Sequence, residues 1–275
     1  MFQIVCFAVP PAKTLGNSTF WAYTNLTLAS FKKLNSKVRA ILLTKKKAPI
    51  PKGLLFDKVL RSHNASATAH GLMVDELNCW VDFVKSDLFD RPTILIDPDL
   101  LCQHDISSIF EDPFDIGLTW RDVSDEPTPE TFSEIYRTQP FNAGVIFLRP
   151  YRKAIVINFF ENCFDSLENM DQSFWAWYGD QEALLHASGK DHKFNPNPDT
   201  WHHNGTVFKA FPCDLFNFSQ PYTKTGDYKL QCFNEPHIVH FKGERSKLMF
   251  RYAQEFLGIS LAHDRKQPGG IKITI

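Results

Sequence analysis

Short apolar runs alternate with helical patterns through the first half of the chain, and this alternation restricts the fold more than any other feature of the sequence. The expected strands are the runs at 2–9, 38–44, 55–60 and 93–96. The expected helices cover 26–34 and 71–85. Strands that are separated by helices form parallel sheets covered by those helices. The sequence therefore predicts an α/β fold with a largely parallel sheet.

The second half of the chain changes character. Residues 114–120 and 141–148 have the pattern of strands, and residues 153–167 and 173–187 have that of helices. From residue 191 the chain is rich in Asn, Pro, Phe and His and has no clear period, which predicts irregular structure and short strands. We expect residues 1–275 to form one domain, with 191–275 as an irregular C-terminal portion.

Charge and hydrophobicity narrow the classes of partner. The 30 basic and 31 acidic side chains give a net charge of -1, so no overall field attracts nucleic acid or an anionic membrane. No apolar run approaches the roughly 20 residues of a membrane span. Residues 2–9 are too short for a signal sequence and run into Pro10, so we expect a buried strand and a cytoplasmic protein. The six scattered cysteines, without a CxxC pair, predict reduced core residues.

Two carboxylates follow the apolar run at 93–96, in the sequence Asp97-Pro98-Asp99. Side chains alternate along a strand, so Asp97 and Asp99 are expected on one side and Pro98 on the other. Proline donates no ladder hydrogen bond, which places the pair where strand pairing ends, at the sheet edge where ligands of α/β sheets bind. Their oxygens suit Mg²⁺ or Mn²⁺. The alternative is a turn with two solvated aspartates.

Two further motifs carry polar groups beside apolar ones. Residues 141–148 form an apolar strand that contains Asn142, whose amide can bond sugar hydroxyls, and Gly144, which permits close approach. The alternative is a capped strand with a bulge. Residues 179–185 place Asp180 in an aromatic and apolar helical region, where a buried carboxylate can hold a sugar ring. Its alternative role is that of a helix N-cap.

A fourth motif joins a histidine to a basic cluster. His240 ends a short strand, and Gly243 turns the chain beside Lys242, Arg245 and Lys247. Imidazole can bind Mn²⁺, and clustered cations can hold phosphates. The alternatives are a structural histidine and a solvated basic face.

In this order, the four motifs resemble those of glycosyltransferase family 8, and of glycogenin in particular. The family pattern is Asp-x-Asp after a strand, a Phe-Asn-x-Gly-Val strand, Gly-Asp-Gln at a helix and His-Phe-x-Gly followed by a lysine. The matching segments here are Asp97-Pro98-Asp99, Phe141-Asn142-Ala143-Gly144-Val145, Gly179-Asp180-Gln181 and His240-Phe241-Lys242-Gly243. The segment Glu76-Leu77-Asn78-Cys79-Trp80 is similar to a Lys-Leu-x-x-Trp helix of the family.

The resemblance implies an α/β fold of the GT-A type, a Rossmann-like mixed sheet flanked by helices, in an enzyme that transfers a sugar from a UDP-sugar with Mn²⁺ (or Mg²⁺) and retention of configuration. Residues 191–275 would then lie on the acceptor side, the acceptor being a glycan, a protein or a small molecule. The implied metal ligands are Asp97, Asp99 and His240, with Asp97 also near the ribose. The implied contacts to the donor sugar or the reacting centre are Asn142, Asp180 and Gln181. The remaining donor-binding residues are Ala8, Val9, Gly243, Arg245 and Lys247.

Two positions depart from the family pattern. The lysine of the Lys-Leu-x-x-Trp helix is Glu76 here, so one cationic contact to the donor is absent or comes from elsewhere. The lysine after His-Phe-x-Gly corresponds to Ser246, and its neighbours Arg245 and Lys247 are the candidates to replace it. We select Lys247.

Three other functions compete with this interpretation. A sugar-phosphate nucleotidyltransferase has related metal chemistry but carries a glycine- and arginine-rich loop after its first strand, where this chain has Ala8-Val9-Pro10-Pro11-Ala12. A glycoside hydrolase needs carboxylates about 5 to 9 Å apart on opposite sides of the bond, a layout that Asp97 and Asp99, expected on the same face, do not suggest. An inactive relative that binds sugar or protein without turnover is the third.

Overall fold

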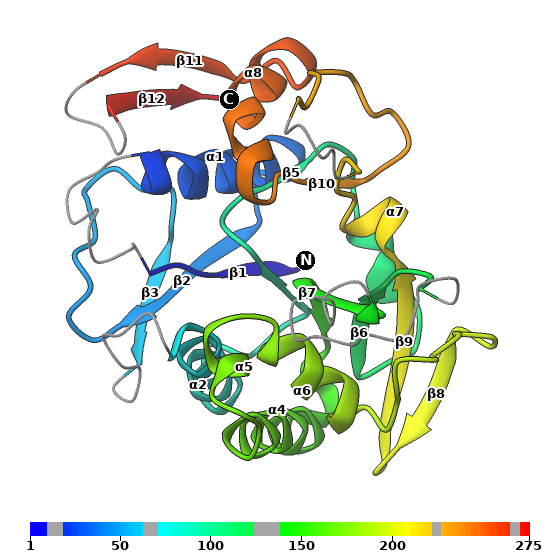
Figure 1. Cartoon of the computed structure of the whole chain (residues 1–275). Coiled ribbons are helices and arrows are strands. Elements are labelled where there is room, and N and C mark those ends of the chain that lie inside the picture. The colour runs from blue at the N-terminus through cyan, green and yellow to red at the C-terminus, as the bar shows by residue number, and fades with distance from the viewer. Residues whose placement is uncertain (10–18, 63–70, 124–137, 222–226, 265–269) are drawn as a thin grey trace.

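The computed structural model describes residues 1–9, 19–62, 71–123, 138–221, 227–264 and 270–275. Within these residues an eight-stranded sheet lies between two layers of helices (Figure 1). Its strands are β1 (Gln3–Phe7), β2 (Arg39–Lys45), β3 (Lys58–Ser62), β4 (Thr93–Ile96), β6 (Ile116–Trp120), β7 (Phe141–Leu148), β8 (Thr200–His203) and β9 (Thr206–Pro212). Their order across the sheet is β3-β2-β1-β4-β7-β6-β9-β8.

The first four strands are parallel, and their side chains alternate between two buried layers. In β1, Ile4 and Cys6 enter one hydrophobic cluster, and Val5 and Phe7 enter the other. Burial on both faces explains why this strand is apolar throughout. Beyond β4 the sheet is mixed, because β7 runs antiparallel to both β4 and β6. The mixed α/β sheet is confirmed, whereas the expectation of a largely parallel sheet holds only for β1 to β4.

Helices cover both faces of the sheet (Figure 1). One layer contains α1 (Thr19–Leu34) and α8 (Ser246–Phe256), which contact each other. The other contains α2 (Leu72–Lys85), α4 (Lys153–Glu168), α5 (Ser173–Ala176) and α6 (Gly179–Ala187). The remaining elements are β5 (Leu100–Cys102), β10 (Ile238–His240), β11 (Ser260–His263), β12 (Ile271–Thr274), the short helix α7 (Cys213–Phe216) and the 3₁₀ turns η3 (Ser107–Glu111), η4 (Pro150–Arg152) and η5 (Gly243–Arg245).

The single helix expected over 173–187 is wrong, because the chain breaks between α5 and α6. Tyr178 has a φ of 63°, in the left-handed region that ends a right-handed helix. Gly179 is packed so tightly that an added Cβ would lie 2.2 Å from the carbonyl oxygen of Phe174. This close packing fixes the break and makes Gly179 the first residue of α6.

Other boundaries also differ from expectation. The strand expected at 55–60 lies at Lys58–Ser62, and α1 begins seven residues before the expected start at residue 26. The portion from residue 191 is more regular than expected, because β8 and β9 extend the main sheet. Burial alternates in the first part of β9, the signal of a half-buried strand. Of the six cysteines, five are buried as expected, but Cys232 is exposed. No helix within the described ranges is long and apolar enough to cross a bilayer.

Candidate metal centre at the end of the central strand

The chain turns at the end of β4, and this turn brings two carboxylates to the edge of the sheet. The N–H of Asp97 donates the last bond of the strand ladder to the carbonyl oxygen of Gly144, at 3.0 Å. The hydroxyl of Thr27, on α1, donates to the carbonyl oxygen of Pro98 at 2.8 Å. The turn is therefore held from both sides, and it leaves Asp97 and Asp99 to face the same point.

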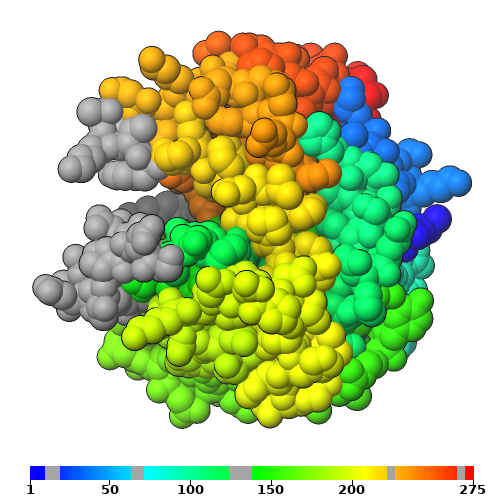
Figure 2. All heavy atoms as spheres, turned by 90° about the vertical axis from the view of Figure 1, so that its right-hand side faces the viewer, coloured from blue at the N-terminus to red at the C-terminus, as the bar shows by residue number. Residues whose placement is uncertain are grey.

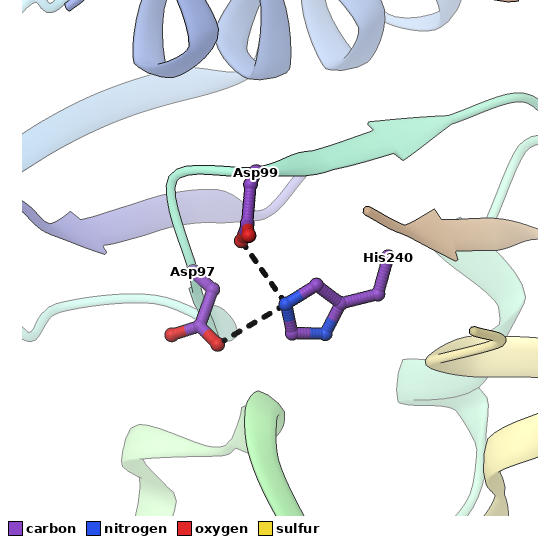
Figure 3. A group of neighbouring side chains, drawn as sticks. All are labelled: Asp97, Asp99 and His240. Atoms are coloured by element: carbon purple, nitrogen blue, oxygen red, sulfur yellow. Dashed lines mark hydrogen bonds and ion pairs between the residues drawn. The ribbon is translucent and has the colours of Figure 1, made fainter. Parts of the chain in front are cut away.

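A histidine from the far end of the chain reaches that point. His240 ends β10, which pairs antiparallel with β5, and it lies opposite Leu100. Its Nε2 atom is 3.0 Å from Asp99 Oδ1 and 3.4 Å from Asp97 Oδ2 (Figure 3). One ligand atom from each of the three residues lies within 4.8 Å of the others. The predicted convergence of two acids and a distant imidazole is thus present in the fold.

The orientation of the imidazole ring is set by a buried amide. His240 Nδ1 is 2.8 Å from Asn217 Oδ1. The amide nitrogen of Asn217 donates to Thr119 Oγ1 at 2.9 Å and approaches the carbonyl oxygen of Asn142 at 3.4 Å, so the amide oxygen must face the imidazole. His240 therefore donates from Nδ1, and Nε2 is the nitrogen that faces the two carboxylates, as a proton donor or as a metal ligand. Partners of this kind fix the tautomer of metal-binding histidines.

Gly144 lies directly under this group. A Cβ atom at position 144 would be 2.6 Å from His240 Cε1 and 2.9 Å from Asp97 Oδ2. The register of β6 and β7 also shifts between Leu118 and Thr119, opposite this part of β7. The bulge offered as an alternative is therefore present, together with a close approach of His240 and Asp97 that only glycine permits.

This geometry fits a divalent cation. Two carboxylate oxygens and one imidazole nitrogen face each other, and His240 is 3% exposed. A proton or a metal cation between Nε2 and the carboxylates makes these contacts favourable. Carboxylate and imidazole donors together suit Mn²⁺.

Further acidic groups surround the site. Asp180 lies in the first turn of α6, and the N-cap of this helix is Tyr178. The N-cap role expected as an alternative for Asp180 is therefore wrong. Burial first, and then the charge of Asp97, raise the pKa of Asp180 to about 7. Burial also raises the pKa of Asp97, an effect that His240 and Lys242 oppose. The region therefore carries more negative charge than its own cations balance.

The cations of the basic cluster occupy different positions. Lys247 is exposed and forms an ion pair with Glu244. The guanidinium of Arg245 lies 5.1 Å from the centre of the Tyr228 ring. Lys242 is half-buried; its charge lowers the pKa values of both Asp97 and Asp180, and burial lowers its own pKa. Among the cluster's basic residues, Lys242 is the one that sequence reasoning left out of the site and the fold brings to it.

Asn142 and Gln181 are two further residues that the sequence predicts for the site. Asn142 uses its side-chain oxygen to accept the N–H of Gly144 at 3.1 Å, which leaves its NH₂ group for other contacts. Gln181 follows Asp180 in α6, and its backbone N–H bonds that carboxylate. Both residues are half-buried.

Three predicted donor-binding residues have mainly backbone roles in the fold. Ala8 continues β1 and uses both its backbone groups, donating to Leu43 at 3.0 Å and accepting from Thr44 at 2.8 Å. Val9 is the last described residue before a gap. Gly243 has a φ of 56°, which favours glycine, and a Cβ there would meet nothing within 4 Å.

The molecular surface is hollowed beside the parts of the chain that build the site. Figure 2 shows a recess between the orange part of the chain and the bright green part. The colour scale assigns orange to the region that contains β10 and bright green to the region that contains β7.

Comparisons with known proteins agree with this architecture at the level of fold. No family model and no curated protein matches the chain. The chain is similar to the crystal structure of a glycosyltransferase involved in glycosylation of the major capsid of PBCV-1, with a TM-score of 0.50 and 11% identity over 90% of this chain and 98% of that one. It is also similar to mouse xyloside xylosyltransferase 1 in its apo form, with a TM-score of 0.50 and 14% identity over 88% of this chain and 97% of that one. The chain therefore has the fold of GT-A glycosyltransferases, as the motif series predicts.

Proposed function

We propose that this protein is a metal-dependent glycosyltransferase that moves a sugar from a nucleoside diphosphate donor, UDP-sugar being the expected one, to an acceptor. The observation that carries the proposal is the convergence of Asp97, Asp99 and His240 on one point at the carboxyl end of β4. Ligands of open α/β sheets bind at the carboxyl ends of the strands, which is where these three residues lie. A sugar nucleotide combines a diphosphate, which needs positive charge, with hydroxyl groups, which carboxylates can bind.

The protein groups divide into two sets around such a donor. Asp97, Asp99 and His240 would hold Mn²⁺, which when bound neutralises charge on the diphosphate leaving group. Lys242 adds a fixed positive charge on the same side. Asp180, with its raised pKa, accepts hydrogen bonds from sugar hydroxyls and orients the ring. We propose retention of anomeric configuration as the outcome.

The remaining predicted residues complete the proposed donor site. Gln181 follows Asp180 in α6, and Asn142 lies in β7 with its NH₂ group left for other contacts. Both side chains can form hydrogen bonds with the sugar. Ala8, Val9 and Gly243 would line this donor site. Residues 191–275 provide the acceptor side.

A panel of nucleotide sugars tests the proposal without knowledge of the acceptor. UDP-, GDP- and other nucleotide sugars are incubated with the protein and Mn²⁺, and release of the nucleotide by slow hydrolysis is measured. UDP-xylose belongs in the panel because one similar structure is a xylosyltransferase. We expect UDP release that EDTA stops. Thermal stabilisation by UDP and Mn²⁺ without any release would indicate an inactive sugar-binding relative. If UDP is not released and does not stabilise the protein, the proposal is overturned.

Replacing Lys242 by methionine should lower the rate of UDP release on the order of 100-fold, because a half-buried cation beside the proposed leaving group is lost while its apolar stem is kept. The same change at Lys247, which is exposed and paired with Glu244, is the matched control and should alter the rate less than twofold. Rates are measured at saturating Mn²⁺. A larger loss in the Lys247 variant than in the Lys242 variant would return the role to Lys247, the residue favoured by the sequence.

A further inference from the structure

A groove runs between α2 and α4, in the helical layer that also contains α5 and α6 (Figure 1). Its volume is about 510 Å³, which lies in the range of ligand-binding pockets. The two helices pack against each other through buried side chains such as Trp80 and Phe160, whose ring centres are 5.7 Å apart. The groove itself is lined by half-buried and exposed side chains, most of them polar.

The lining residues follow the same spacing in both helices. In each helix, four of them stand at positions i, i+3, i+4 and i+7, which lie along one face of a helix. On α2 these residues are Asn78, Val81, Asp82 and Lys85, and on α4 they are Asn158, Glu161, Asn162 and Asp165. A rise of about 1.5 Å per residue makes each of these two stripes roughly 10 Å long. Two stripes rich in amides and carboxylates therefore line the same groove.

The stripes contain asparagines in helix interiors, where this residue is unfavourable. Asparagine is about 0.6 kcal/mol worse than alanine at such a position. The side chains of Asn78, Asn158 and Asn162 form no hydrogen bond with another described residue. Each amide carries both a donor and an acceptor, the combination that the N–H and C=O of a peptide unit complement. A bound peptide backbone would therefore use groups that the described part of the chain leaves open.

The carboxylates of the stripes outnumber their cation. Lys85 is the one cation among the lining residues, and Glu161 holds it at 2.6 Å. Asp82 and Asp165 form no ion pair with a described residue, so the groove has an excess of two negative charges. These carboxylates do not converge on one point as the acids of the metal centre do. By charge complementarity, the groove favours a partner whose cations are spaced apart.

We propose that the α2–α4 groove binds an extended polypeptide segment that carries basic side chains. The three asparagine amides pair with N–H and C=O groups of its backbone. Asp82 and Asp165 bind its Lys or Arg side chains through charge-assisted hydrogen bonds. At about 3.3 Å per extended residue, each stripe spans about three residues of such a segment.

An oligosaccharide is the other kind of ligand that amides and carboxylates can bind, and the groove suits it less well. An aromatic face would cover the apolar side of a sugar ring. Phe164 is the only aromatic residue among the lining residues, and it packs against the hydrophobic core. A neutral oligosaccharide would also leave the charges of Asp82 and Asp165 without a counter-ion.

The groove lies apart from the metal centre. Lys153 Nζ, at the start of α4, donates to the carbonyl oxygen of Ser86 at 2.6 Å, so the end of α2 meets the start of α4. From Ser86 the chain continues to the amino end of β4, whereas Asp97 follows the carboxyl end of that strand. The proposal is therefore independent of the proposed function, and variants in the groove should keep the wild-type rate of UDP release.

Short probes that bind to the intact protein test the groove. A heptapeptide of alternating Arg and Ala, acetylated and amidated at its ends, carries four charges on a peptide backbone. Spermine carries four charges without such a backbone, and maltohexaose is a neutral glycan. Dissociation constants are measured by calorimetry for the wild type and for three double variants, which are Asp82→Asn with Asp165→Asn, Asn78→Ala with Asn162→Ala, and the control Glu111→Gln with Glu168→Gln. The two control residues are exposed and lie outside the groove.

We expect the wild type to bind the heptapeptide about 10-fold more tightly than spermine, because only the peptide can use the amides. Each groove variant should weaken peptide binding about 10-fold, and only the carboxylate variant should weaken spermine binding. The control should change both affinities less than twofold. Alanine is the better helix former, so the amide variant should keep its thermal midpoint or raise it.

Three results would overturn the proposal. The first is no peptide binding to the wild type, or peptide binding that is the same in the groove variants as in the control. The second is spermine binding as tight as peptide binding, with no effect of the amide variant, which would show attraction by charge without a peptide site. The third is preferred binding of maltohexaose, which would make the groove a glycan site.

Discussion

Replacing Asp99 by alanine should abolish Mn²⁺-dependent release of UDP, with a loss of about 1,000-fold or more in rate. The physical reason is that Asp99 Oδ1 is the carboxylate oxygen nearer to His240 Nε2, at 3.0 Å, so its removal takes away a charged ligand and leaves the imidazole without its main partner. The measurement is UDP release against Mn²⁺ concentration, together with direct Mn²⁺ binding by electron paramagnetic resonance.

The control for this variant is Asp87→Ala, which removes an exposed aspartate in the loop that precedes β4. It carries the same change of charge but lies beyond the opposite end of that strand, so both the rate and Mn²⁺ binding should stay at wild-type values. Circular dichroism and the thermal midpoint establish that both variants are folded. A wild-type rate with the wild-type Mn²⁺ dependence in Asp99→Ala would remove Asp99 from the ligand set.

Replacing Gly144 by alanine should have a similarly large effect without removing any ligand. The new Cβ would lie 2.6 Å from His240 Cε1, 2.8 Å from its Nδ1 and 2.9 Å from Asp97 Oδ2, distances at which real Cβ atoms do not lie. The imidazole cannot retreat freely, because Asn217 holds its Nδ1 and the ring is buried. We expect Mn²⁺ affinity to fall about 100-fold, since displaced ligands and their supporting partners cost 10- to 100-fold or more.

The neighbouring residue gives the matched control. Ala143 lies in the same strand, and its side chain packs into the opposite hydrophobic cluster. Ala143→Gly also changes one methyl group in β7 and should cost stability of about 1 kcal/mol, yet it should leave Mn²⁺ affinity unchanged. Wild-type Mn²⁺ binding in a folded Gly144→Ala variant would show that the imidazole is not confined as described.

Local sequence patterns predicted the bounds of strands whose apolar residues are consecutive in the sequence. The apolar run at Thr93–Ile96 ends where expected, and the strand over Phe141–Leu148 has the predicted bounds. Periodicity could not reveal the break at Tyr178, because a left-handed residue inside an aromatic segment depends on packing against Phe174. It also gave no sign that β7 runs antiparallel to its neighbours, since direction depends on the connection and not on the strand.

The site divides in the same way. Asp97 and Asp99 follow from two-residue alternation at a strand end, but the approach of His240 depends on the pairing of β10 with β5, a contact that no local pattern contains. The proposed role of Lys242 in place of Lys247 depends on tertiary structure, because Lys242 lowers the pKa of Asp97 whereas Lys247 pairs with Glu244. Asn217 stands between two phenylalanines in the sequence, and a lone amide in such a setting is the only local signal of its role.

The separation of the ligands along the chain has a thermodynamic consequence. Asp99 and His240 are 141 positions apart, and they meet only when β10 has docked on β5. A cation bound between them would cross-link the first half of the polypeptide to the layer formed by its last third. By mass action, the ion would stabilise the docked arrangement in proportion to its concentration relative to its dissociation constant. Loading with metal and closure of the C-terminal layer are then a single equilibrium, so each reports on the other.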